Sequence, residues 1–181
     1  MDNNVIRDAF TSQSKKGYLS DKMVNLINSL IAAEFNAQQL YKSMETWAKY
    51  TGYEGLGAFM AGHTGDENNH MNKLYSYMLE RQVNPITPAV KQQPTTYKDL
   101  KDVLEKGLAH EELIENTYKK AVKDALADND HTTYTFLQWF LNEQVEEIDL
   151  FSKWLDRLDV VGYGKKGMYF IDKEIMESLN A

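Results

Sequence analysis

The chain has 181 residues, a length that fits one domain, and its 43% hydrophobic and 26% charged residues are ordinary for a globular protein. The net charge of −7 argues against nucleic acid as a main partner, because phosphate binding requires a basic surface. The absence of cysteine excludes disulfides, zinc fingers and thiolate iron centres, so any metal must be held by Asp, Glu, His or Gln.

No apolar stretch of the chain approaches the roughly 18 residues that are needed to cross a bilayer. Residues 1–19 also lack the apolar core of a signal peptide. We therefore expect a cytoplasmic protein that does not bind membranes and that carries an N-terminal extension over residues 1–19.

Turn-forming residues divide the remaining chain into four long helical segments. The divisions fall at residues 51–53, 128–130 and 162–167, and at a stretch from 85 to 94 that holds all three prolines. The expected helices cover about residues 20–49, 54–82, 97–127 and 130–160. Ser20 and Asp130 are expected to cap the first and fourth helices, and Thr96 with Asp99 resembles a capping box for the third.

The connections between the four helices predict how they are arranged. Short breaks join the first helix to the second and the third to the fourth, so each pair is expected to form an antiparallel hairpin. The connection of about residues 82–95 is long enough to run the length of a bundle. The sequence therefore predicts an all-α domain over residues 20–161, a four-helix bundle with one long crossover.

Each expected helix carries an apolar stripe with alternating steps of four and three residues, the spacing of a bundle seam. Each stripe is apolar at both ends and is interrupted near its middle by a glutamate. These glutamates are Glu34, Glu67, Glu111 and Glu147, and His70 lies one turn after the second of them. On the fourth helix the expected stripe reads Phe136, Phe140, Glu143, Glu147, Leu150, Trp154 and Leu158.

In an antiparallel bundle the midpoints of the helices meet at one level, so these side chains are expected to converge inside the core. An unpaired buried ion costs several kcal/mol, and no lysine or arginine lies on the stripes at that level. Two divalent cations would balance the four carboxylates. Mixed carboxylate and imidazole ligands favour iron or manganese over zinc.

The spacing of the ligand pairs supports a two-metal site. Glu67 and His70 form a Glu-x-x-His pair, which places both side chains on one helix face. Gln144 and Glu147 have the same spacing on the fourth helix. Since di-iron bundles of this type carry Glu-x-x-His on two helices, the Gln-x-x-Glu pair predicts one metal with a full ligand set and a second that is held more weakly.

Several nearby residues allow two interpretations. His63, one turn before Glu67, is either a further ligand or a histidine at the edge of the core. Tyr41 is either a core aromatic or a residue that hydrogen-bonds a ligand or donates an electron. Three further acids near Glu147 form either an extra metal position or a solvated acidic face; they are Asp66, Glu143 and Glu146.

Several of these segments resemble the bacterial non-haem ferritins, and the resemblance extends from about residue 19 to residue 179. It is carried by residues 34–41, 66–70, 110–111, 136–147 and 167–174. The resemblance implies a ferritin-like four-helix bundle with a long crossover between its second and third helices, followed by a linker and a short fifth helix over residues 162–181. It also implies a hollow shell of 24 identical subunits that stores a ferric mineral.

The resemblance further implies a ferroxidase centre in each subunit, where O₂ or H₂O₂ oxidises Fe²⁺. Tyr41 matches a tyrosine beside this centre in the family. In the family's pattern the first iron is held by Glu34, Glu67, His70 and Glu111, with Glu67 bridging. The second iron is surrounded by Glu67, Glu111, Gln144 and Glu147. A third site would use Asp66, Glu143, Glu146 and Glu147.

The chain also departs from the family at some positions. Asp66 stands where close relatives have glutamate, and Gly62 and Gly65 lie in the middle of a helix, where each costs about 1 kcal/mol relative to alanine. The haem-binding relatives carry Glu-x-x-His on both halves, so no haem is expected. Two alternatives to iron storage remain open: an oxidase or peroxidase of the ferritin-like superfamily that acts on another substrate, and a metal-free scaffold.

Overall fold

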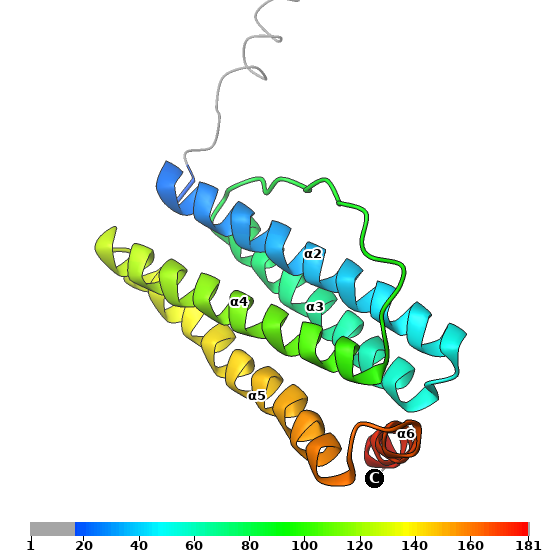
Figure 1. The fold of residues 1–181 in the computed structure, drawn as a ribbon. Coiled ribbons are helices and arrows are strands. Elements are labelled where there is room, and N and C mark those ends of the chain that lie inside the picture. The colour runs from blue at the N-terminus through cyan, green and yellow to red at the C-terminus, as the bar shows by residue number, and fades with distance from the viewer. Residues whose placement is uncertain (1–16, 181) are drawn as a thin grey trace, which may run out of the picture.

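The computed structural model describes residues 17–180, and the chain in this range is helical and has no strand. Figure 1 shows the long helices side by side as a bundle, with a short helix across one end. The predicted all-α bundle of four long helices with a short fifth helix is confirmed. The helices are α2 (Asp21–Thr51), α3 (Glu54–Glu80), α4 (Leu100–Ala127), α5 (His131–Val161) and α6 (Lys165–Leu179).

The two hairpins are also as predicted, because α2 packs mainly against α3 and α4 packs mainly against α5. None of the helices within residues 17–180 is both long and apolar enough to span a bilayer. Residues 1–16, which make up most of the expected N-terminal extension, lie outside the described residues.

Two of the three predicted helix caps are confirmed. The side chain of Ser20 accepts a hydrogen bond from the backbone N–H of Met23, and that of Asp130 accepts one from Thr133. The prediction for the third helix is wrong, because α4 begins at Leu100 and its N-cap is Asp99. Asp99 has extended backbone angles and accepts from the N–H of Asp102, so the helix begins three residues after the expected start.

The long connection between α3 and α4 runs along α2 (Figure 1). Near its start, the N–H of Ile86 donates to Asn28 Oδ1 at 2.8 Å. Near its end, the hydroxyl of Ser43 donates to the carbonyl oxygen of Pro94. Asn28 and Ser43 are about 22 Å apart along α2 at 1.5 Å per residue, so these two contacts alone span about half of α2, and the connection lets α4 start at the opposite end of the bundle from the end of α3.

The predicted stripes on the first three helices are buried along their whole length. On α5 the prediction is wrong at three positions: Leu137, Gln144 and Phe151 are buried in place of Phe136, Glu143 and Leu150. Phe136–Leu137 and Leu150–Phe151 are both apolar pairs, so hydrophobicity alone did not decide which member faces inward. The buried positions of α5 still follow steps of four and three residues, but each of the three differing positions lies one residue later than predicted.

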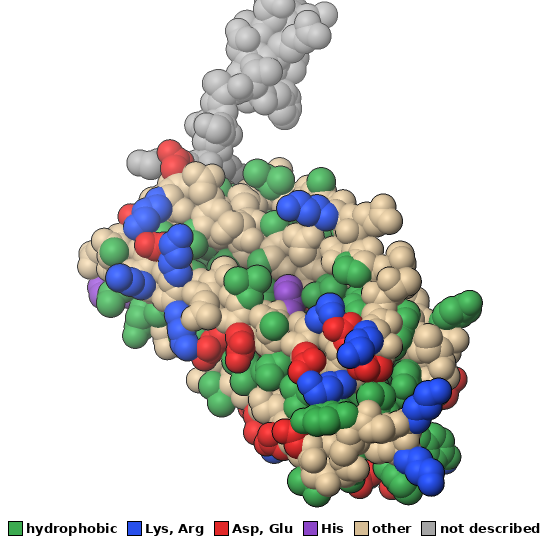
Figure 2. All heavy atoms as spheres, viewed as in Figure 1, with side chains coloured by type: hydrophobic (Ala, Val, Ile, Leu, Met, Phe, Trp, Pro, Cys, Tyr) green, Lys and Arg blue, Asp and Glu red, His purple; other side chains and the backbone are tan. Residues whose placement is uncertain are grey.

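Buried apolar side chains form two clusters, one towards each end of the bundle. One cluster includes Phe151, Trp154 and residues of α6, and the other includes Ile27, Leu74 and Phe140. The predicted carboxylates lie between the two clusters. Outside the core, acidic and basic side chains are interspersed over the face in Figure 2, and several are paired one turn apart, such as Lys101 with Glu105.

Candidate metal centre

All four long helices contribute a buried carboxylate at mid-height in the bundle. Glu34 is 1% exposed, Glu67 is 3%, Glu111 is 0% and Glu147 is 8%. Within residues 17–180 none of the four forms an ion pair with a lysine or arginine. The interior therefore holds four carboxylates that no lysine or arginine balances.

Glu34, Glu67 and His70 form the most compact part of the centre. Each offers one ligand atom, and these three atoms lie within 4.8 Å of one another. His70 Nδ1 lies 3.3 Å from Glu67 Oε2 and 3.8 Å from Glu34 Oε2. The Glu-x-x-His spacing on α3 brings the first pair together, and the packing of α2 on α3 adds the third ligand.

Glu111 on α4 is held by two protein donors. The hydroxyl of Tyr41 donates to its Oε1, and the side-chain amide of Gln144 donates to its Oε2 at 3.1 Å. Tyr41 is therefore both a buried core aromatic and a hydrogen-bond partner of a predicted ligand. The amide nitrogen of Gln144 is used in this hydrogen bond to Glu111. Its Oε1 is buried and has no hydrogen-bond partner.

Tyr118 on α4 also belongs to this site, although the sequence analysis gave it no role. Its hydroxyl donates to Glu34 Oε1 across the interface between α4 and α2. Tyr118 occupies a core position two turns after Glu111, where its neighbours on the stripe are apolar. The sequence did contain one indication of this contact: a buried tyrosine on an apolar stripe needs a hydrogen-bond partner for its hydroxyl.

His63 contacts Glu147 at the edge of the centre, a position that is compatible both with a further metal ligand and with a core histidine. Its Nδ1 lies 2.8 Å from Glu147 Oε2, and its ring packs between Phe59 and Phe151. The ring is almost fully buried, at 4% exposure. His63 thus lies beside a predicted ligand and within an aromatic cluster, and it is not part of the compact three-ligand group.

The electrostatics of the centre follow from burial and from repulsion among the acids. Burial, and then the charge of Glu34, raise the pKa of Glu67 well above its ordinary value. Burial raises the pKa of Glu111 from 4.5 to about 7. For Glu34 burial also acts upward, but the interactions with His70 and Glu67 outweigh it and hold the pKa below the ordinary value.

Several buried atoms of the centre have no hydrogen-bond partner. They are Glu34 Oε2, Gln144 Oε1 and Glu147 Oε2, the last of which forms no hydrogen bond of normal geometry despite its proximity to His63. Buried polar atoms are nearly always satisfied, so three such oxygens at one level of the core are unusual. Oxygen and imidazole ligands of this kind fit a divalent cation such as Fe²⁺ or Mn²⁺.

The three acids of the possible extra metal position are more open to solvent. Asp66 and Glu146 are exposed, and Glu143 is half-buried. Among the described residues they do not form, with Glu147, a group of ligand atoms as compact as the one around His70. These acids would have to move to bind one cation together.

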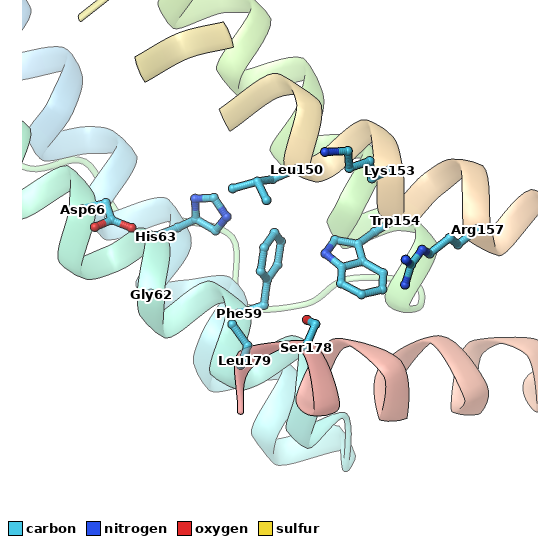
Figure 3. A pocket seen from close by; sticks show the side chains of 10 residues that line it. All are labelled: Phe59, Gly62, His63, Asp66, Leu150, Lys153, Trp154, Arg157, Ser178 and Leu179. Carbon is cyan, nitrogen blue, oxygen red and sulfur yellow. The ribbon is translucent and has the colours of Figure 1, made fainter. Parts of the chain in front are cut away.

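A pocket of about 380 Å³ opens beside the centre, between α3, α5 and α6. Figure 3 shows His63 and Asp66 on one side of it and Trp154 with Arg157 on the other, with the end of α6 beneath. His63 lines this pocket and also contacts Glu147, so it lies between that carboxylate and the pocket.

A family model described as the ferritin-like domain matches residues 24–161. A probable bacterial non-heme ferritin-like protein from Haemophilus influenzae is 36% identical over 157 residues, which cover 87% of this chain and 95% of that protein. A bacterial non-heme ferritin from Campylobacter jejuni is also 36% identical, over 87% of this chain and 94% of its own length.

The fold is also similar to that of solved structures. An open pore ferritin from the archaeon Archaeoglobus fulgidus superposes with a TM-score of 0.84 and 30% sequence identity. The match covers 87% of this chain and 98% of that one.

Proposed function

The chain belongs to the ferritin-like family, and from this premise we propose that it oxidises Fe²⁺ with O₂ at a di-iron centre inside each subunit and stores the ferric product. The observation that carries the proposal is the group formed by Glu34, Glu67 and His70, beside buried oxygens that have no hydrogen-bond partner. A pair of divalent cations would supply the missing partners and balance the four carboxylates.

The ligands divide between two iron positions in this proposal. The first iron is held by Glu34, Glu67, His70 and Glu111. The second lies between Glu67, Glu111, Gln144 and Glu147. The second set contains the amide of Gln144 in place of an imidazole, so we expect the second iron to bind more weakly and to leave more readily.

In the reaction each Fe²⁺ gives one electron to O₂, so a pair of irons reduces O₂ by two electrons to the level of H₂O₂. The protein holds the two ions side by side and provides charge that favours Fe³⁺ over Fe²⁺. Tyr41, hydrogen-bonded to Glu111, is placed to stabilise this shared ligand or to supply a further electron.

We also propose a third, transient iron position outside the pair, formed by Asp66, Glu143, Glu146 and Glu147. Asp66 and Glu146 are exposed, and Asp66 also lines the pocket, so iron in this position would lie at the edge of the core. The exposure of Asp66 and Glu146 suits a site through which ions pass, because a weak ligand set releases its metal.

The storage part of the proposal requires a homo-oligomeric shell of 24 copies of the 20.9 kDa chain in the cytoplasm. Size-exclusion chromatography tests it directly, since such a particle elutes far from a monomer or dimer. A small oligomer that consumes O₂ without forming a mineral would instead support a di-iron oxidase or peroxidase with another substrate.

The ferroxidase proposal is tested with Glu34→Ala and His70→Ala. Both variants should lose the rapid phase of Fe²⁺ oxidation by O₂ while the oligomer still assembles. Glu112→Ala is the matched control, because Glu112 is an exposed glutamate on α4 next to the centre in sequence. Rapid oxidation that is unchanged in both core variants would refute the assignment.

A further inference from the structure

We propose that Tyr118 is a positioning residue of the metal centre: its hydroxyl engages Glu34 Oε1 and thereby leaves Oε2 as the one oxygen of Glu34 that binds metal. This inference rests on the proposed function, since it assumes that Glu34 is a ligand. It concerns a residue for which neither the spacing of the motifs nor the family pattern indicated a role.

Tyr118 is held rigidly in the core. It is 1% exposed, and its ring stacks on Phe140 of α5 with a centroid distance of 4.7 Å and an interplanar angle of 9°. Its hydroxyl donates its hydrogen to Glu34 Oε1. The stacked ring restricts the direction in which the hydroxyl can point.

The two oxygens of Glu34 are consequently in different environments. Oε1 accepts the hydrogen bond of Tyr118. Oε2 is buried, has no hydrogen-bond partner, and lies 3.8 Å from Nδ1 of His70, itself a member of the three-ligand group. The hydrogen bond from Tyr118 fixes the plane of the carboxylate, so that one oxygen faces the tyrosine and the other faces His70.

Glu111 provides a comparison within the same site. Both of its oxygens accept hydrogen bonds from protein donors, Tyr41 on one side and Gln144 on the other. Glu34 has a donor on one side only. The structure therefore contains two tyrosines from different helices that each orient a different carboxylate, and Tyr118 acts at the first metal position.

Loss of the hydroxyl would have two effects on Glu34. Oε1 would be left buried without a partner, which is unfavourable in an apolar interior. The carboxylate would also be free to turn and to bind metal through both oxygens. Because partners that orient a ligand typically change metal affinity about 10- to 100-fold, a similar loss is expected here.

The test is an anaerobic titration of the assembled, metal-free protein with Co²⁺, followed by its visible absorption. Co²⁺ prefers ligands similar to those of Fe²⁺, and its spectrum reports the number and geometry of its ligands. In Tyr118→Phe, which keeps the ring, we expect the Kd of the tightest site to rise about 10- to 100-fold and the band intensity to change.

Tyr77→Phe is the matched control. Tyr77 is also a buried tyrosine, but its hydroxyl bonds Thr133 Oγ1 at 2.7 Å, and it contacts none of the proposed ligands. Its substitution should leave the Kd and the spectrum of Co²⁺ unchanged. If Tyr118→Phe does not fold, Tyr118→Met, whose flexible side chain can fill the space, should show the same loss of affinity.

The outcomes separate this inference from the proposed function. If the unmodified protein binds no stoichiometric Co²⁺, the metal centre itself is refuted. If it binds Co²⁺ and the Tyr118 variants match it in Kd and in spectrum, the positioning role is refuted. An equal loss in Tyr77→Phe would also overturn the role, because any change in core packing would then have the same effect.

Discussion

The carboxylate of Asp172 on α6 caps α3, since its Oδ1 accepts a hydrogen bond from the backbone N–H of Leu56 at 2.8 Å. α3 has no capping side chain of its own, because Tyr53 at its N-cap makes no such bond. Gly55 permits the close approach of the two helices: a Cβ there would lie 1.8 Å from the backbone oxygen of Asp172. The fifth helix is therefore attached to the bundle at a defined point.

Replacement of Asp172 by alanine should destabilise the protein. The first turn of α3 loses its cap, which costs about 0.5–2 kcal/mol. For a chain of this size each kcal/mol lowers the melting temperature by about 2–4 °C, a shift that circular dichroism detects. Glu177→Ala, on an exposed position of the same helix, is the control; a comparable shift in this variant would show that Asp172 has no special role.

Glycines on two helices should respond in opposite ways to alanine. A Cβ at Gly107 would lie 2.2 Å from Cε1 of Phe151, so Gly107→Ala should overpack the core and destabilise it by about 1–3 kcal/mol. Gly62 and Gly65 have no neighbouring atom within 4 Å of a built Cβ. Their replacement should stabilise α3 by about 1 kcal/mol each through helix propensity.

Urea unfolding of the three glycine variants measures these differences. The comparison is internal, since all three substitutions add one methyl group to the middle of a helix. A Gly107 variant as stable as the Gly62 variant would show that α4 and α5 are less tightly packed than the structure indicates.

The fold, and the height along the bundle at which the site lies, could be predicted from the sequence alone. Periodic apolar positions and the confined prolines predicted four helices with one crossover, and a glutamate at mid-height of each helix predicted that carboxylates such as Glu34 and Glu111 would meet. These features repeat over several turns, so small errors in a helix boundary leave them unchanged. The start of α4 shows such an error, since Asp99 and not Thr96 is the N-cap.

Features that depend on one side chain were not predictable in this way. The inward position of Phe151 in place of Leu150 depends on the space above Gly107, which belongs to another helix. The role proposed for Tyr118 depends on the direction of its hydroxyl, which is restricted by stacking on Phe140. On an apolar stripe a tyrosine is indistinguishable from a packing residue until the partner of its hydroxyl is known.

The metal-free protein should become less stable as the pH rises from about 5 to 8. Folding raises the pKa of Glu111 from 4.5 to about 7, and it also raises those of Glu67 and His70. The folded state therefore holds more protons than the unfolded state in this range, and the stability that they contribute is lost as the pH passes through the raised pKa values. His110, whose pKa is lowered by burial, acts in the opposite direction.

Thermal unfolding of chelator-treated protein across this pH range measures the trend. Glu111→Gln should flatten it, because the neutral amide resembles the protonated acid. Glu112→Gln changes an exposed glutamate beside it and should retain the full dependence. A melting temperature that rises steadily from pH 5 to 8 in the unmodified protein would contradict the raised pKa values.

Metal binding should release protons, and its affinity should increase with pH up to the raised pKa values. A carboxylate must be ionised to bind a cation, and Glu111 with a pKa of about 7 is largely protonated in the metal-free centre at pH 6. Calorimetric titration with Co²⁺ in two buffers of different protonation enthalpy counts the protons released. Release should be larger at pH 6 than at pH 8, and Glu111→Gln should reduce it, since one titrating ligand is removed. Equal heats in both buffers at pH 6 would mean that the carboxylates are already ionised before metal arrives, and that the core balances their charge by other means.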